Sequence, residues 1–247
     1  MQVMHIVSTF VMNFKQSVVP QIMASYGKND LTRMHRLVNT GTKITFLLML
    51  IVTFPIIFEG EYILKLWLKE PPQYSYELVC LVLININVSS FTYFMYQGVH
   101  ATGKITTQQI VMSMLYILNI VGIYIVFKFG YTFYYGIFVT IIVSFLQCVT
   151  NLYFASKTFE YSIRIFLKTI LPQSFIIIAI TTTIMYFMTT NIDSSFVRLL
   201  ISTMTSSIII VVAGYFIMLD KEEKRNIVNL VKGFFSRKKN SAQTIVS

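Results

Sequence analysis

The 247-residue chain is 55% hydrophobic and 12% charged, and its mean hydropathy is +0.67. Soluble domains contain roughly 45–50% apolar and about 25% charged residues, so this composition excludes an ordinary soluble domain and indicates an integral membrane protein. The net charge of +10 is concentrated in loops and the tail, which fits an anionic membrane surface, and we expect no nucleic-acid partner.

Seven apolar runs approach the length of a membrane-spanning helix, which needs about 20 mostly apolar residues. They predict an all-α bundle of seven transmembrane helices at 2–23, 38–58, 78–98, 106–127, 131–154, 166–188 and 196–219. Residues 1–154 hold five of these helices, and residues 155–219 add two more. Residues 220–247 form a basic tail with apolar residues at helical spacing, so we expect an amphipathic helix on anionic lipids.

Lysine and arginine gather in every second gap between these runs. The first gap contains Lys28, Arg33, Arg36 and Lys43, whereas acids match bases in the second gap, which begins at Glu59. Basic residues return in the third gap, the fifth gap and the tail. Because short cytoplasmic loops carry the excess of Lys and Arg, the pattern predicts an external N-terminus and a cytoplasmic C-terminus.

Polar residues recur at helical spacing within several runs. In the first run His5, Thr9, Asn13 and Ser17 lie four residues apart, with Gln16 on the same face. Hydroxyl groups at such positions are typical of packing between helices, whereas amides are costlier to bury and equally indicate a water-filled cavity. The candidates for lining a substrate cavity are Lys15, Asn13, Gln16, Asn85, Asn119, Gln147, Asn151 and Arg198.

Lys15 is the most informative single charge because it interrupts the first apolar run. One interpretation places its ammonium in a cavity, where it would bind an anionic group such as a phosphate. The other is that the helix tilts or begins later, so that Lys15 lies near the interface. Arg198 allows the same two interpretations at the outer end of the last run, with snorkelling to the interface as the second.

Motifs of catalysis and cofactor binding are missing from the sequence. It contains no His/Cys metal cluster, nucleophile elbow or pair of carboxylates within the apolar runs, so we expect no enzyme activity, metal or cofactor. The segment Gly98–Lys104 resembles a phosphate-binding loop, but Ile105 follows where Ser or Thr is required. The last run also lacks the lysine that a retinal protein needs.

Several short segments match a known family in their order and spacing. They are PQIMASYGKND at 20–30 with Leu31, Arg33, Met34 and Leu37 after it, ILKLWL at 63–68, QGVHATGK at 97–104, Asn119, and Gly130 before Gly136. Together they resemble the bacterial polysaccharide flippases of the multidrug/oligosaccharidyl-lipid/polysaccharide exporter superfamily. The resemblance covers roughly residues 20–151, and each segment alone is a loose match.

The resemblance implies a transporter that flips an undecaprenyl-pyrophosphate-linked oligosaccharide across the bacterial inner membrane for polysaccharide or O-antigen biosynthesis. Such proteins have two six-helix lobes and often two further helices, with a cationic central cavity and alternating access. This chain resembles the second lobe from its second helix onward, so the expected partners include a missing N-terminal lobe. The family's cavity arginines have no residue-by-residue match here.

The sequence is also compatible with other functions. A multidrug exporter of the same fold should show carboxylates within its spans and an aromatic cavity. A truncated fragment would not transport at all. A glycan polymerase or ligase would need a large outer loop with catalytic Arg or His, and the predicted outer loops are too short for that.

Overall fold

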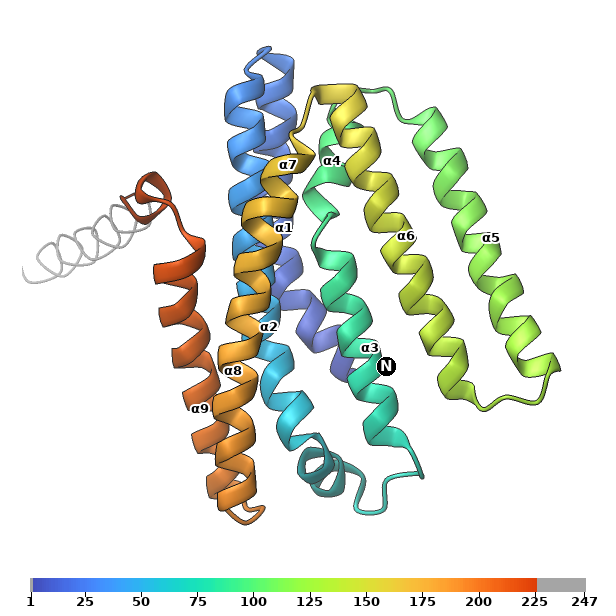
Figure 1. Ribbon diagram of the computed structural model, residues 1–247, viewed down its shortest axis with the longest axis vertical. Helices are drawn as coiled ribbons and strands as arrows, with labels where there is room; N and C mark the ends of the chain where they lie inside the picture. Colours follow the sequence, from blue (N-terminus) through green and yellow to red (C-terminus); the bar gives the residue numbers. More distant parts are fainter. Residues whose placement is uncertain (1, 226–247) are drawn as a thin grey trace, which may run out of the picture.

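The computed structural model describes residues 2–225, and the regular structure in this range is entirely helical (Figure 1). This confirms the all-α prediction. The elements in chain order are α1 (Gln2–Gly27), α2 (Leu31–Leu68), α3 (Ser75–Ser90), α4 (Tyr93–Ala101), α5 (Thr106–Lys128), α6 (Phe133–Phe159), α7 (Ile163–Ile165), the π-helical turn η1 (Phe166–Ile170), α8 (Leu171–Asn191), α9 (Phe196–Ala213) and the π-helical turn η2 (Gly214–Met218).

The helices run up and down, so that alternate connections lie at opposite ends of the bundle. Figure 1 shows the α1–α2, α4–α5 and α6–α7 connections at its upper end and the α2–α3, α5–α6 and α8–α9 connections at its lower end. We call the upper end the basic end, because the basic gaps of the sequence lie there. The assignment of this end to the cytoplasm stays a prediction.

Six helical segments are long and apolar enough to cross a membrane. They are Leu31–Leu68, Ser75–Ala101, Thr106–Lys128, Phe133–Phe159, Ile163–Asn191 and Phe196–Met218. The 26-residue α1 is long enough to cross a bilayer, but it carries Asn13, Lys15 and Gln16 and is not among the six. The structure therefore supports a multi-pass membrane protein with six candidate spans among the described residues, and the seventh span stays a prediction.

Two predicted boundaries were wrong. The second span, expected at 38–58, is part of a longer helix from Leu31 to Leu68, so Glu59, which we expected in the following loop, lies inside α2. The third span, expected as one helix at 78–98, is interrupted between Ser90 and Tyr93.

The tail begins with a helix start, of which only the first residues are described. The backbone N–H of Asp220 donates to Glu223 Oε2 over 2.8 Å, and a helical turn follows from Lys221. An acidic residue that reaches back three positions in this way is a capping box, which satisfies an amide at the start of a helix. The rest of the predicted amphipathic tail lies outside the described residues.

Small residues let the helices of the core approach closely. A Cβ atom added to Gly41 on α2 would lie 2.8 Å from the ring of Phe94 on α4, and one added to Gly98 would lie 2.8 Å from the ring of Phe159 on α6. Both rings are buried. Close backbone approach at small residues is typical of membrane bundles, where dispersion contacts drive helix packing.

Replacing Gly41 with alanine tests this packing. The added methyl group must displace the buried Phe94 ring, and overpacking of this kind costs about 1–3 kcal/mol. We expect that loss in the free energy of unfolding measured in mixed SDS micelles. Gly27→Ala is the matched control, since its Cβ would meet no atom within 4 Å. Equal stability of the two variants would contradict the close contact.

Candidate functional site

Lys15 lies in the middle of α1 and is held against α4. Its ammonium nitrogen is 4.4 Å from the centroid of the Tyr93 ring, and both side chains are half-buried. At about 1.5 Å per residue, Lys15 is roughly 18 Å from the end of α1 at Gly27. Its stem is too short to carry the charge that far. A cation above a tyrosine face is stabilised by the ring quadrupole.

Asn13 and Gln16 are the neighbours of Lys15 on α1, and both are exposed. Ser17 is exposed as well, and its hydroxyl donates to the backbone oxygen of Phe14 over 2.7 Å. Asn13 lies two residues before Lys15, on nearly the opposite side of the helix, and Gln16 lies about 100° around the helix from Lys15, so both amides are on other faces of α1 than the one that rests on Tyr93. Of the predicted stripe, the side chain of His5 lies outside the described part of the structure.

Asn151 lies behind Tyr93, in a hydrogen-bonded chain that joins three helices. Its Nδ2 donates to Thr92 Oγ1 over 3.2 Å, and its Oδ1 accepts from Gln108 Nε2 over 3.0 Å. The Thr92 hydroxyl also contacts the Cys148 sulfur, at 3.4 Å. Thr92, Gln108 and Asn151 are all buried. The sequence indicated Asn151, but it gave no reason to choose Gln108 or Thr92 as its partners.

This chain coincides with the interruption between α3 and α4. The Val88 carbonyl accepts from the backbone N–H of Phe91 over 3.3 Å and from the Cys148 thiol over 3.3 Å. Backbone groups released by a helix break in a membrane need partners from neighbouring helices, because lipid supplies none. Cys148 and Asn151 on α6 therefore make the break tolerable at this point.

A second polar contact holds the far half of α4. Gln109 Nε2 donates to Tyr96 Oη over 2.8 Å and lies 2.8 Å from His100 Nε2. Gln108 and Gln109 are adjacent in the first turn of α5. We call Thr92, Tyr96, His100, Gln108, Gln109 and Asn151 the α4 polar network. It fixes the position of α4 relative to the α5–α6 hairpin.

The remaining amide candidates lie elsewhere in the bundle. Asn119 on α5 accepts a hydrogen bond from Thr140 on α6 over 3.2 Å. Gln147 is half-buried on α6, one turn before Asn151. Asn85 on α3 is half-buried, and its Oδ1 has no hydrogen-bond partner within the described residues. The structure thus places Lys15 against Tyr93, with Asn151 connected to the neighbouring Thr92, whereas Asn13 and Gln16 lie on other faces of α1 and the remaining candidates lie elsewhere.

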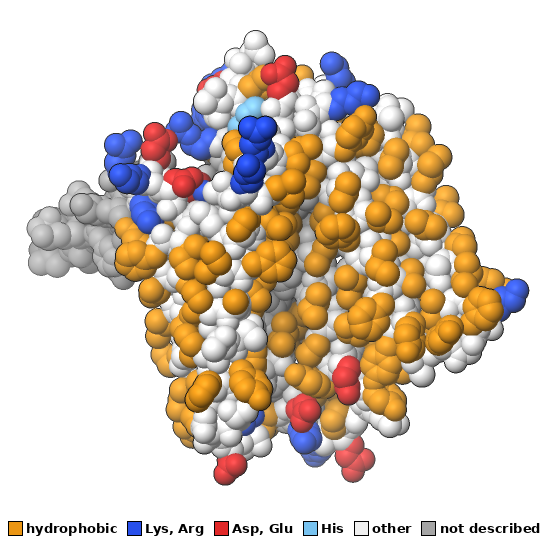
Figure 2. Space-filling model, in the orientation of Figure 1, with side chains coloured by type: hydrophobic (Ala, Val, Ile, Leu, Met, Phe, Trp, Pro, Cys, Tyr) orange, Lys and Arg blue, Asp and Glu red, His pale blue; other side chains and the backbone are white. Residues whose placement is uncertain are grey.

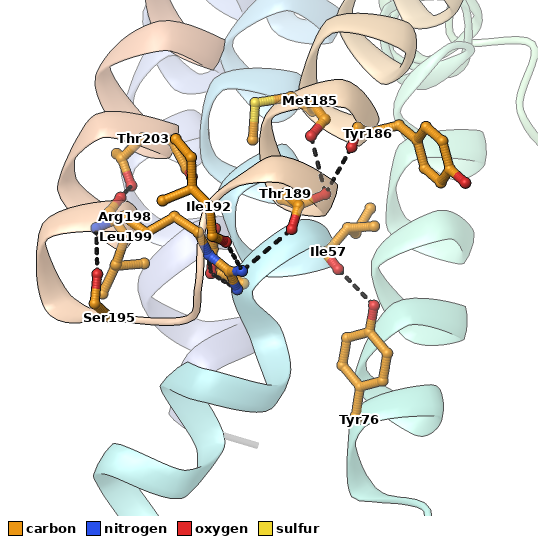
Figure 3. Close-up of polar contacts among 12 residues, drawn as sticks. Ile57, Tyr76, Met185, Tyr186, Thr189, Ile192, Ser195, Arg198, Leu199 and Thr203 are labelled. Atoms are coloured by element: carbon orange, nitrogen blue, oxygen red, sulfur yellow. Dashed lines mark hydrogen bonds and ion pairs between the residues drawn. The ribbon is translucent and has the colours of Figure 1, made fainter.

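Arg198 belongs to a separate cluster at the lower end of the bundle. Its Nε and Nη2 donate to Glu59 Oε2 over 3.1 and 2.8 Å, and the Ser202 hydroxyl donates to Glu59 Oε1 over 2.7 Å. Figure 3 shows the guanidinium directed at the end of α8, where Nη1 donates to the carbonyls of Thr189 and Ile192 over 3.3 and 2.7 Å. Arg198 therefore joins α2, α8 and α9.

A second buried ion pair lies at the basic end, near the start of the predicted second span. The ammonium of Lys43 is 2.8 Å from Asp220 Oδ2 and 2.9 Å from Glu223 Oε2, and the lysine side chain is only 3% exposed. Thr40 also donates to Glu223. Figure 2 shows acidic and basic side chains gathered at this corner. The sequence reasoning missed this pair because the acids follow Lys43 by almost 180 residues.

An apolar cavity of about 390 Å³ lies between α2, α3 and α8. Its wall is formed by aromatic and aliphatic side chains, among them Phe54, Phe91 and Phe175, with Asn87 as one of few polar groups. Figure 2 shows a furrow in this region of the surface. The cavity lies away from Lys15, so the structure separates an apolar recess from the polar face of α1.

Comparison of the chain with protein-family models, with curated proteins and with solved structures gave no match. Within residues 2–225, no cluster of three or more His, Cys, Asp or Glu side chains is placed to hold a metal ion. The site must therefore be interpreted from its own chemistry, which is a mid-helix cation on an aromatic ring beside exposed amides.

The buried pair of Glu59 and Arg198 predicts a large effect of a single substitution. The Arg198 side chain is only 12% exposed, and Glu59→Leu removes the carboxylate that compensates its charge. We expect this substitution to lower the free energy of unfolding by about 3–5 kcal/mol. Glu61→Leu is the control, because Glu61 is exposed and its loss should change stability by about 0.5 kcal/mol or less. Unfolding in mixed SDS micelles measures both, and a loss in E59L as small as that in E61L would disprove the pairing.

Proposed function

We propose that this chain is part of a transporter that flips an undecaprenyl-pyrophosphate-linked oligosaccharide across the bacterial inner membrane. The observation that supports it is the Lys15 ammonium, which rests on the Tyr93 ring in the middle of a membrane-length helix that also carries the exposed amides Asn13 and Gln16. A cation at that depth marks a functional site, and a pyrophosphate is an anion that it can bind through charge-assisted hydrogen bonds.

Exposed amides at membrane depth need protein or water beside them, since lipid offers no hydrogen bonds. In this proposal the exposed amides Asn13 and Gln16 line the central cavity, Lys15 lies at the edge of the cavity against Tyr93, and an N-terminal lobe closes the other side. The cavity holds the pyrophosphate and the sugars while the two lobes rock about it. No bond is made or broken, so the protein needs no catalytic residue for this step.

The orientation belongs to the same proposal. The basic end, with Lys28, Arg33 and Arg36, faces the cytoplasm, and the basic tail lies on anionic lipids of the inner leaflet. A substrate made at the cytoplasmic surface would then enter from the basic end. The distribution of Lys and Arg supports this orientation, and the up-and-down course of the helices is compatible with it.

A multidrug exporter of the same fold is the second candidate, and Glu59 is the observation that favours it. This carboxylate is buried inside an apolar helix, as a site for a proton or a cationic drug would require. However, both of its oxygens accept hydrogen bonds from Arg198 and Ser202, so its charge is already compensated. The Lys15 ammonium, in contrast, rests on the Tyr93 ring and on no carboxylate within the described residues, which favours an anionic substrate.

Reconstitution distinguishes these functions. The chain is purified together with any polypeptide that copurifies with it. It is then reconstituted into vesicles that contain either a fluorescent polyprenyl-pyrophosphate oligosaccharide or a cationic dye. We expect the glycolipid to become accessible to external dithionite beyond the outer-leaflet fraction, and the dye to stay. Movement of the dye alone would support the multidrug exporter, and movement of neither probe would contradict a transport function.

Lys15→Leu tests the anion site in the same assay. Hydrogen bonds to charged groups are worth about 1.5–3 kcal/mol, so the variant should flip the glycolipid at least about tenfold more slowly at limiting substrate. Lys104→Leu is the control, because Lys104 is exposed in the α4–α5 connection. Equal flipping rates for K15L and K104L at equal protein levels would remove Lys15 from the site.

A further inference from the structure

The α4 polar network begins directly beside the Lys15 site. Tyr93, whose ring lies beneath the Lys15 ammonium, is the first residue of α4. The preceding residue, Thr92, is held by Asn151, which is held in turn by Gln108. A shift of Thr92 therefore moves the ring on which the cation rests, although neither Asn151 nor Gln108 contacts Lys15.

We infer that Gln108 and Asn151 are positioning residues for Lys15, acting through Thr92 and Tyr93. Asn151 is only 8% exposed, and its amide nitrogen and oxygen are both bonded to protein. It is therefore placed to orient the site rather than to contact the substrate, which changes the role that the sequence suggested for it. This inference rests on the proposed function, in which the ammonium binds the pyrophosphate.

Burial makes this connection stiff. Gln108 and Thr92 are 0% and 1% exposed, so water cannot replace their hydrogen bonds when the helices move. The contact of Gln109 with Tyr96 and His100 fixes the next turn of α4 to the same end of α5. The α5–α6 hairpin and α4 therefore move together, and a movement of the hairpin in transport reorients the Lys15 ammonium.

Gln108→Met tests the connection at its remote end, because it removes the amide and keeps the side-chain volume. The reporter is the indole introduced by Tyr93→Trp in a Trp67→Phe background, since Trp67 is the chain's single tryptophan. We expect Q108M to shift the emission maximum and to change iodide quenching. Thr150→Val is the control, because the Thr150 hydroxyl donates to Leu146 of its own helix. Identical spectra for Q108M and T150V would overturn the inference.

The functional consequence is measured with a matched pair at Thr92. Thr92→Val removes the hydroxyl that Asn151 binds, whereas Thr92→Ser keeps it. T92V loses one hydrogen bond that positions Tyr93, and we expect this loss to raise the KM for glycolipid flipping about two- to tenfold. The kcat of T92V should be nearly unchanged, and T92S should behave like the original protein. A T92V protein with the same KM as T92S would overturn the positioning role.

The K15L measurement separates this inference from the proposed function. If K15L blocks flipping and T92V leaves KM unchanged, the flippase proposal stands and the positioning role falls. If K15L leaves flipping intact, the proposed anion site falls, and the indole spectra of Q108M still decide whether Gln108 controls the position of residue 93. A spectral shift together with a raised KM supports both steps.

Discussion

A buried charge must have a partner, and α2 carries two of them inside the bundle. Removing an ion from water costs several kcal/mol, which only close and well-oriented partners offset. Lys43 finds Asp220 and Glu223 beyond the end of α9, and Glu59 finds Arg198 at the start of α9. The two pairs are about 24 Å apart along α2, at about 1.5 Å per residue. They fix both ends of α9, and Arg198 also binds the end of α8, so the last two spans can pack in only one register.

The irregular backbone of the spans follows from the same need for partners. The α3–α4 interruption occurs where Cys148 and Asn151 of α6 can bond to Val88 and Thr92. Pro172 directly follows the π-helical turn η1 inside the continuous helical segment Ile163–Asn191, so its missing amide hydrogen falls where the regular α-helical hydrogen-bond pattern is already interrupted. At η2, a Cβ on Gly214 would lie 2.7 Å from Leu47, so α9 ends in close contact with α2, four residues along α2 from Lys43.

The helices themselves could be predicted from the sequence, because each apolar run is a local signal of about one membrane thickness. The partners of the charged residues could not be predicted in this way. Glu59 and Arg198 are 139 residues apart, and a charge at the end of an apolar run looks the same whether it lies in a loop or is paired within a helix. Asn151 and Lys15 were found as polar interruptions of apolar runs. Gln108 was missed because an amide near a helix end is common, and the contact of Thr92 with Asn151 was missed because no Gly or Pro marks the α3–α4 break.

The two sides of the bundle need different surroundings. Most of α5 beyond its contact with α6 is apolar and exposed, including Ile117 and Ile120, which suits lipid. The surface of α1 is polar instead, because Asn13 and Gln16 are exposed there and the same helix carries the half-buried Lys15. In the proposed arrangement lipid solvates the first surface, and a partner lobe or water lies against the second. In the proposed transporter this difference decides which side closes over the substrate, and the α4 polar network connects the lipid-facing hairpin to that side.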